Sequence, residues 1–90
     1  MAHTQRDKDK LIARTRRLKG QIEGVERALA GEAPCGEILR QLASVRGAMN
    51  GLMAEIMEDH LREHVVEASG EAERREGGED LVAVIRTYLK

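Results

Sequence analysis

One thiol and three imidazoles are the side chains of this 90-residue chain with the most specific chemistry. Cys35 is the single cysteine, and His60 and His64 are four residues apart. Residues at this spacing share one face of a helix, so the two imidazoles can bind one ion together. Thiolate and imidazole are the ligands that nickel, cobalt, copper and zinc prefer. These residues therefore predict a transition-metal site.

The separation between Cys35 and His60 restricts how they can share an ion. If one helix connects them, their 25-residue separation spans about 37 Å, at a rise of roughly 1.5 Å per residue. A hairpin at the turn signal Asn50-Gly51 would bring them together within one chain. Alternatively, two copies pack antiparallel across a two-fold axis. We favour the second geometry, because the apolar pattern crosses Asn50-Gly51 without losing phase, and the ion would then bridge two subunits.

The N-terminal residues can complete the donor set. Removal of Met1 before the small Ala2 would leave a free amine next to His3, and such a nitrogen pair chelates nickel or cobalt well. Nitrogen-rich donors with one sulfur favour Ni(II) and Co(II), and we rank Zn(II) and Cu(I) below them, since Cu(I) would want more thiolate. The predicted ligands are the amine of Ala2, His3, Cys35, His60 and His64, with Glu63 as a further ligand or a hydrogen-bond acceptor behind one.

Simpler interpretations of these residues stay open. A lone cysteine near a helix start is often just a small buried residue, and two histidines at this spacing are often solvated. Residues 60–64 also fit the H-x-x-E-H pattern of inverted zinc peptidases, with Glu63 as general base. Five residues of common type are a weak signal, and a short helical chain has little room for a third ligand and a substrate cleft. We therefore predict no enzyme.

The elements that position these residues are predicted to be helices. There is no Trp or Phe and one Tyr, so the core must be built from aliphatic side chains and Met. In the first helix, spacings of seven, four, three and four relate Leu11, Leu18, Ile22, Val25 and Leu29. Gly77-Gly78 indicates a connector before a short last helix. We expect one domain with a flexible arm over 1–6 and helices over 7–30, 34–68 and 79–90.

The central helix carries a seam like that of a coiled coil. Its apolar positions, at spacings of four and three, are Ile38, Leu42, Val45, Met49, Leu52 and Ile56. Pro34 suits a first helical turn. These patterns predict an all-α protomer. Because so short a chain buries a small fraction of its surface, we also expect this protomer to associate with itself.

The first helix is basic within a chain of net charge −1. Residues 1–30 carry eight Lys/Arg against four Asp/Glu, and residues 31–60 carry two against five. The basic stripe consists of Lys10, Arg14, Arg17 and Gln21, widened by Arg16 and Lys19. It could lie along a nucleic-acid backbone, or be a solvated face, which the net charge favours for a lone chain. Self-association would multiply it into a larger surface. No helix-turn-helix signature is present.

The chain lacks the marks of secretion or membrane insertion. One cysteine cannot form an internal disulfide, and no apolar leader precedes the polar N-terminus. No apolar stretch is long enough to span a membrane. We expect a cytoplasmic protein without a membrane partner.

Nearly the whole chain resembles the copper-sensing operon repressor family (CsoR/RcnR/FrmR), small helical repressors without a helix-turn-helix. The resemblance rests on His3-Thr4 with residues 6–8, the basic 14–22 stretch, Cys35, the run QLASVRGAMNGLM at 41–53, residues 60–64 and the closing residues 88–90. It implies a dimer of dimers that binds operator DNA, expected to be a G/C-rich inverted repeat, in the apo form. An inducer would release the DNA.

The same resemblance implies the site and its inducer. The sensing cysteine corresponds to Cys35 and the other ligands to His3, His60 and His64, a pattern similar to the nickel/cobalt efflux repressors. Copper sensors carry a second cysteine at position 64, and formaldehyde sensors usually carry Pro at position 2 and a non-histidine at 64, so this chain departs from both. The residues expected to contact DNA are Lys10, Arg14, Arg16, Arg17, Lys19, Gln21 and Arg46.

The expected function is a repressor of an exporter for Ni(II) or Co(II). One alternative inducer is formaldehyde, acting on the Cys35 thiol and the N-terminal amine. An alternative of another class is a helical interaction or metal-storage module that does not bind DNA.

Overall fold

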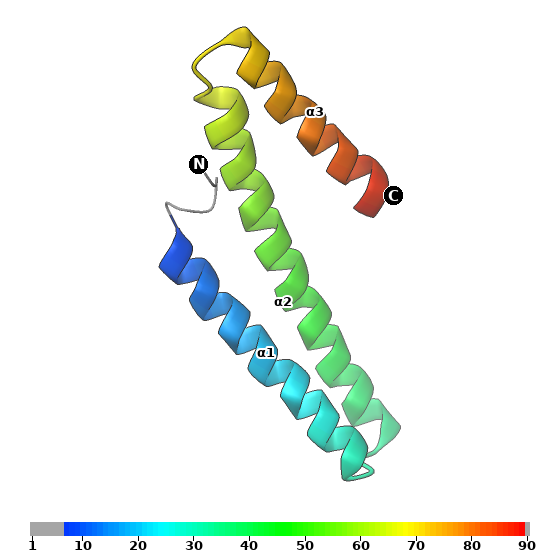
Figure 1. Ribbon diagram of the computed structural model, residues 1–90. Coiled ribbons are helices and arrows are strands. Elements are labelled where there is room, and N and C mark those ends of the chain that lie inside the picture. The colour runs from blue at the N-terminus through cyan, green and yellow to red at the C-terminus, as the bar shows by residue number, and fades with distance from the viewer. Residues whose placement is uncertain (1–6, 90) are drawn as a thin grey trace. The chain divides into compact units, whose positions relative to one another are not determined.

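The computed structural model describes residues 7–89, and within them every regular element is helical (Figure 1). The elements are α1 (Lys8–Ala30), α2 (Cys35–Leu61), the π-helical turn η1 (Arg62–Val66) and α3 (Glu71–Tyr88). The predicted all-α class with one long central helix is confirmed. The predicted arm over 1–6 lies outside the described residues. The chain forms two compact units, residues 7–53 and 54–89, and each is considered by itself.

In the first unit, α1 packs antiparallel to the first part of α2 (Figure 1). A Cβ built at Gly24 would lie near the Gln41 side chain, and one built at Gly51 would lie 2.7 Å from the Arg14 guanidinium. The buried apolar side chains of α1 are Leu11, Leu18 and Val25, which recur every seven residues. Ile22 and Leu29 of the predicted apolar face are instead 49% and 59% exposed.

α2 runs through Asn50-Gly51 as one unbroken helix, which excludes the hairpin alternative. Its first turn is set by the carbonyl of Pro34, which accepts hydrogen bonds from the amides of Glu37 and Ile38 at 2.9 and 3.2 Å. Pro34 therefore precedes the helix rather than occupying its first turn. The α-helix ends at Leu61, short of the predicted 68, because one extra residue enters the next turn. The amide of Glu67 donates to the carbonyl of Arg62 at 2.8 Å, the i→i+5 bond of a π-helix.

The end of α1 is closed by a Schellman motif whose left-handed residue is Glu32. The amide of Ala33 donates to the carbonyl of Ala28 at 2.9 Å, and that of Glu32 to Leu29 at 3.2 Å. Glu32 has φ 56°, a conformation that favours glycine, whereas Gly31 has φ −86°. Gly31, which indicates the end of the helix in the sequence, thus lies one residue before Glu32, the left-handed position at which glycine would be most favourable.

α3 begins at Glu71, so the prediction of a helix starting at 79 and of a connector at Gly77-Gly78 was wrong. Gly77 is the one buried residue of α3, because this helix packs its backbone directly on η1. A Cβ at Gly77 would lie 2.8 Å from the Cβ of His64 and closer still to its carbonyl oxygen. Gly78 faces open space. Tight packing therefore explains a glycine that composition alone associates with a loop.

The turn before α3 is held by side chains. Ser69 donates to one carboxylate oxygen of Glu73 from its hydroxyl at 2.8 Å and from its amide at 3.3 Å. These two hydrogen bonds, the hydroxyl first, hold the pKa of Glu73 below its usual value, and the nearby His64 acts in the same direction. Arg74 donates to the carbonyls of Val65 and Ala68 at 3.1 and 3.4 Å. These contacts connect the π turn to α3, and their stabilisation offsets the low helix propensity of the two glycines inside α3.

Many apolar side chains of the described residues are exposed in the single chain. α2 contains no buried residue. Leu39 is 59% exposed, and Leu42 and Met49 are each 46% exposed. On α3, Val82, Ile85 and Tyr88 are exposed as well. Exposed apolar side chains in such number on each of these helices are typical of interaction surfaces.

Replacing Glu32 by glycine should stabilise the protein. The substitution relieves the left-handed strain, which we expect to raise the free energy of unfolding by about 0.5–1 kcal/mol. The control is Glu37→Gly, which removes the same charge from the first turn of α2 and should lower it by about 1 kcal/mol. Thermal unfolding at a fixed protein concentration measures both. A melting temperature of Glu32→Gly at or below that of the wild type would contradict the assigned motif.

Gly77 and Gly78 offer a matched pair for the α3 packing. Gly77→Ala places a methyl group against the His64 backbone and should cost about 1–3 kcal/mol of stability. Gly78→Ala meets nothing and should be neutral or stabilising by up to about 1 kcal/mol. Circular dichroism melts of the two variants test this difference. Equal melting temperatures would show that α3 does not depend on close contact with η1.

Candidate functional site

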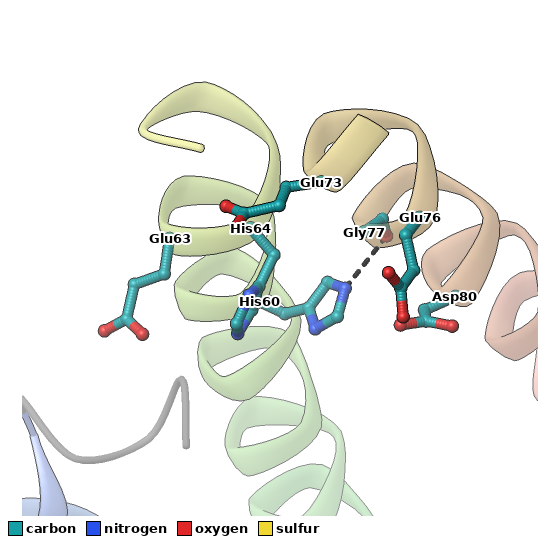
Figure 2. A pocket seen from close by; sticks show the side chains of 7 residues that line it. All are labelled: His60, Glu63, His64, Glu73, Glu76, Gly77 and Asp80. Carbon is teal, nitrogen blue, oxygen red and sulfur yellow. Dashed lines mark hydrogen bonds between the residues drawn. The ribbon is translucent and has the colours of Figure 1, made fainter. Parts of the chain in front are cut away.

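The two neighbouring histidines lie together where α2 passes into η1. Their ring centroids are 4.9 Å apart at an interplanar angle of 44° (Figure 2). His60 belongs to α2 and His64 to the π turn, and both are partly buried. π turns occur frequently at functional sites, because the extra residue changes the direction of neighbouring side chains.

Carboxylates surround this pair in a pocket of about 640 Å³. Glu73, Glu76 and Asp80 come from one face of α3, and Glu63 comes from η1. Figure 2 shows Glu63 extending away from the α3 carboxylates, on the other side of the π turn. Apart from the histidines, every ionisable side chain lining the pocket is acidic, so its field favours a cation.

A hydrogen bond to α3 fixes the orientation of His60. Its Nε2 atom lies 2.9 Å from the carbonyl oxygen of Gly77 (Figure 2). A carbonyl oxygen only accepts, so Nε2 carries the proton, and a neutral ring presents its lone pair at Nδ1. Metal-binding histidines commonly have such a partner on the second nitrogen. The lone pair of His60 is therefore at Nδ1, and its direction depends on the backbone of α3.

The histidine pair places two imidazole rings next to each other. Within residues 7–89, no three side chains of the His, Cys, Asp and Glu types converge to hold one ion. Cys35 is exposed at the first position of α2, in the other unit. The predicted ligands Ala2 and His3 lie outside the described residues. The structure thus brings together His60 and His64, with Glu63 on the rim of the same pocket, and the donor chemistry fits a borderline cation that needs further ligands.

The predicted basic stripe lies along α1, partly turned toward α2. Its side chains are exposed except those of Arg14 and Gln21, which are partly buried, and the predicted Arg46 is exposed on α2. Arg14, Arg17 and Gln21 line a shallow groove together with Leu18 and Ala48. Guanidinium groups and amides thus face the groove between α1 and α2.

The sequence patterns did not predict two sets of residues that line the pockets. The α3 carboxylates Glu73, Glu76 and Asp80 are spaced by three and four, but this signal appears only if the helix begins before Gly77. Arg27, with Gln41 and Ser44 of α2, lines a second groove beside the basic stripe. Arg27 lies six residues after Gln21, outside the spacing of three and four that defines the stripe, so the sequence pattern carried no signal for it.

None of the helices within residues 7–89 combines the length and apolar character that a bilayer crossing requires.

Comparison with known proteins identifies the chain's relatives. A family model described as metal-sensitive transcriptional repressor matches residues 7–87. The chain is 50% identical over 91 residues to an uncharacterised protein in the bioA 5′ region of Serratia marcescens, and 43% identical over 90 residues to the transcriptional repressor RcnR of Salmonella paratyphi B. Each comparison covers 100% of both chains.

A solved structure has the same fold. It is a glutamate-to-histidine variant of the formaldehyde-responsive regulator FrmR from Salmonella enterica serovar Typhimurium. The TM-score is 0.82 at 43% sequence identity, with 96% of this chain and 98% of that chain covered.

These matches determine the class of protein. Transcriptional repressors are not enzymes, so the peptidase pattern at residues 60–64 does not mark a catalytic site. The same matches exclude the alternative of a helical interaction or metal-storage module that does not bind DNA. The chain belongs to the family of metal-sensitive transcriptional repressors, of the RcnR and FrmR type.

Proposed function

We propose that this protein is a cytoplasmic repressor that binds operator DNA without metal and leaves it when Ni(II) or Co(II) binds. Release would allow expression of a metal-efflux gene. The observation that carries this proposal is the His60–His64 pair, oriented by α3 and surrounded by carboxylates. The similarity of this chain to RcnR over the full length of both chains supports the proposal.

The proposed ligands extend beyond the pair. Two imidazoles supply too few donors for a nickel or cobalt site, and the long α2 separates them from Cys35 of the same chain. We therefore assign the thiolate to Cys35 of the partner subunit, with the amine of Ala2 and His3 completing the set and Glu63 as a further ligand or an acceptor behind one. One sulfur among nitrogens favours Ni(II) and Co(II) over Cu(I).

Self-association follows from the same arrangement. In the single chain α2 has no buried residue, and Leu39, Leu42 and Met49 are exposed along it. Burying this face against a second, antiparallel copy would remove apolar surface from water and bring each thiol to another chain's histidines. We propose that two such dimers form a tetramer, in which the α1 basic stripes make a surface for an operator expected to be a G/C-rich inverted repeat.

The hydrogen bond of His60 suggests how metal and DNA binding are coupled. All ligand atoms of a bound ion must lie at bonding distance from it, so side chains from several elements have to converge on one position. His60 cannot turn toward such a point without moving the carbonyl of Gly77 or losing its hydrogen bond to it. Reorientation of His60 is therefore transmitted to α3. If metal weakens DNA affinity by a given factor, DNA weakens metal affinity by the same factor.

Operator release should require both halves of the site. We expect Cys35→Ala and His64→Gln to need at least about tenfold more Ni(II) or Co(II) to release a duplex covering the region upstream of the encoding gene, a loss of about 1.4 kcal/mol of metal binding. Glu58→Gln, an exposed change outside the pocket, is the control. Fluorescence anisotropy measures release, and the Co(II) absorption spectrum reports thiolate ligation independently. Unchanged release of both variants would refute the proposed site.

Formaldehyde is the second candidate inducer, favoured by the similarity to the FrmR variant and by the exposed Cys35 thiol. Formaldehyde can join a thiol to an amine through a methylene bridge with loss of water, which needs Cys35 and the N-terminal amine but no histidine.

His64→Gln separates the two inducers. If metal is the inducer, the wild type releases DNA with Ni(II) or Co(II), and the variant loses that response. If formaldehyde is the inducer, wild type and variant respond equally to it and neither responds to metal. Side-by-side titrations with Ni(II), Co(II), Zn(II), Cu(I) and formaldehyde decide between these results.

A further inference from the structure

A second groove between α1 and α2 lies beside the predicted DNA-contacting stripe. It has a volume of about 380 Å³ and lies within the unit formed by residues 7–53. Arg17 and Arg27 line it from α1, and Gln41 and Ser44 line it from α2. Gln21 and two glycines complete the lining, and no carboxylate takes part.

The lining suits an anion with several oxygen atoms. Two guanidinium groups give the groove a double positive charge, and each can donate a pair of parallel hydrogen bonds to a phosphate. Ser44 and Gln41 add neutral donors. The Oε1 atom of Gln21 is buried and has no hydrogen-bond partner. A half turn of this amide would direct its NH₂ group to the same place.

Gly20 lines the groove at a cost to the stability of the helix. A glycine inside a helix is about 1 kcal/mol less favourable than alanine. A Cβ at Gly20 would meet nothing within 4 Å, and the residue is exposed, so no contact inside the described chain requires glycine there. A glycine without an internal packing reason is consistent with close approach of a ligand from outside.

The groove is continuous with the basic stripe. Arg17 and Gln21 line both this groove and the neighbouring one that contains Arg14. Arg17 and Arg27 are ten residues apart, which is roughly 15 Å along the helix axis. This extent is larger than a single small anion needs and suits a backbone that carries successive phosphates.

We propose that this groove binds the phosphodiester backbone of duplex DNA and adds Arg27, Gln41 and Ser44 to the DNA-contacting residues. The inference rests on the proposed DNA-binding function and extends it to side chains on α2 and to the end of α1. Arg27 donates to a phosphate, Ser44 and Gln41 donate to its neighbouring oxygens, and Gly20 lets the strand approach the α1 backbone.

The first test compares two arginines on the same helical hairpin. Arg27→Gln should weaken binding of the upstream duplex roughly tenfold at low salt, and should reduce the slope of log K against log salt by about one for each subunit on the DNA. Arg40→Gln makes the same charge change outside the groove, and it should change the DNA affinity and the salt slope less than Arg27→Gln does. Equal effects of the two variants would overturn the groove assignment while leaving DNA binding itself intact.

The second test separates ligand contact from folding. Gly20→Ala should raise the melting temperature, because alanine favours the helix, and at the same time reduce DNA affinity. A destabilised Gly20→Ala protein, or a stabilised one with wild-type affinity, would contradict the role assigned to Gly20.

A third measurement distinguishes failure of the groove from failure of the repressor function. Inorganic pyrophosphate is titrated into ¹⁵N-labelled protein, and the amide signals of Gly20, Gly24 and Ser44 are followed in wild type and Arg27→Gln. If no duplex binds but these signals shift only in the wild type, the groove binds phosphate groups and the DNA-binding proposal fails. If no duplex binds and no signal shifts, both proposals fail.

Discussion

The contact between Gly77 and the π turn is the constraint on which the histidine site depends. Because Gly77 has no side chain, the backbone of α3 can lie against His64 and place a carbonyl oxygen within 2.9 Å of His60 Nε2. The same contact sets the face of α3 that brings Glu73, Glu76 and Asp80 to the pocket. One missing methyl group thus determines the ring orientation of His60 and the charge around it.

The two units carry complementary chemistry within one small chain. The unit of residues 54–89 surrounds two imidazoles with carboxylates, which suits a cation. The unit of residues 7–53 lines its grooves with guanidinium groups and amides, which suits phosphate. Both rely on packing that a single chain leaves partial: the buried apolar side chains are Leu11, Leu18 and Val25 among the described residues. Oligomerisation is therefore proposed both to stabilise the fold and to complete the site.

Sequence patterns predicted the elements better than their ends. The spacing of Leu11, Leu18 and Val25 predicted the buried face of α1, and the unbroken seam predicted that α2 passes through Asn50-Gly51. The beginning of α3 was missed because two adjacent glycines reduce helix propensity, whereas contact with η1 and the Ser69–Glu73 hydrogen bonds offset that cost. The π turn has no sequence signature, since it depends on where one extra residue is accommodated.

The sequence by itself determined the helical class, the His60–His64 pair and the basic character of α1, because each depends on residue type and on a spacing of three or four. It also provided the length argument that separates Cys35 from His60 within a single helix. Only the tertiary structure decided which nitrogen of His60 donates to the backbone of α3, which carboxylates lie around the ring and that Arg27 shares a groove with Gln41 and Ser44. Those features depend on contacts between residues distant in sequence, and periodicity within one helix carries no information about them.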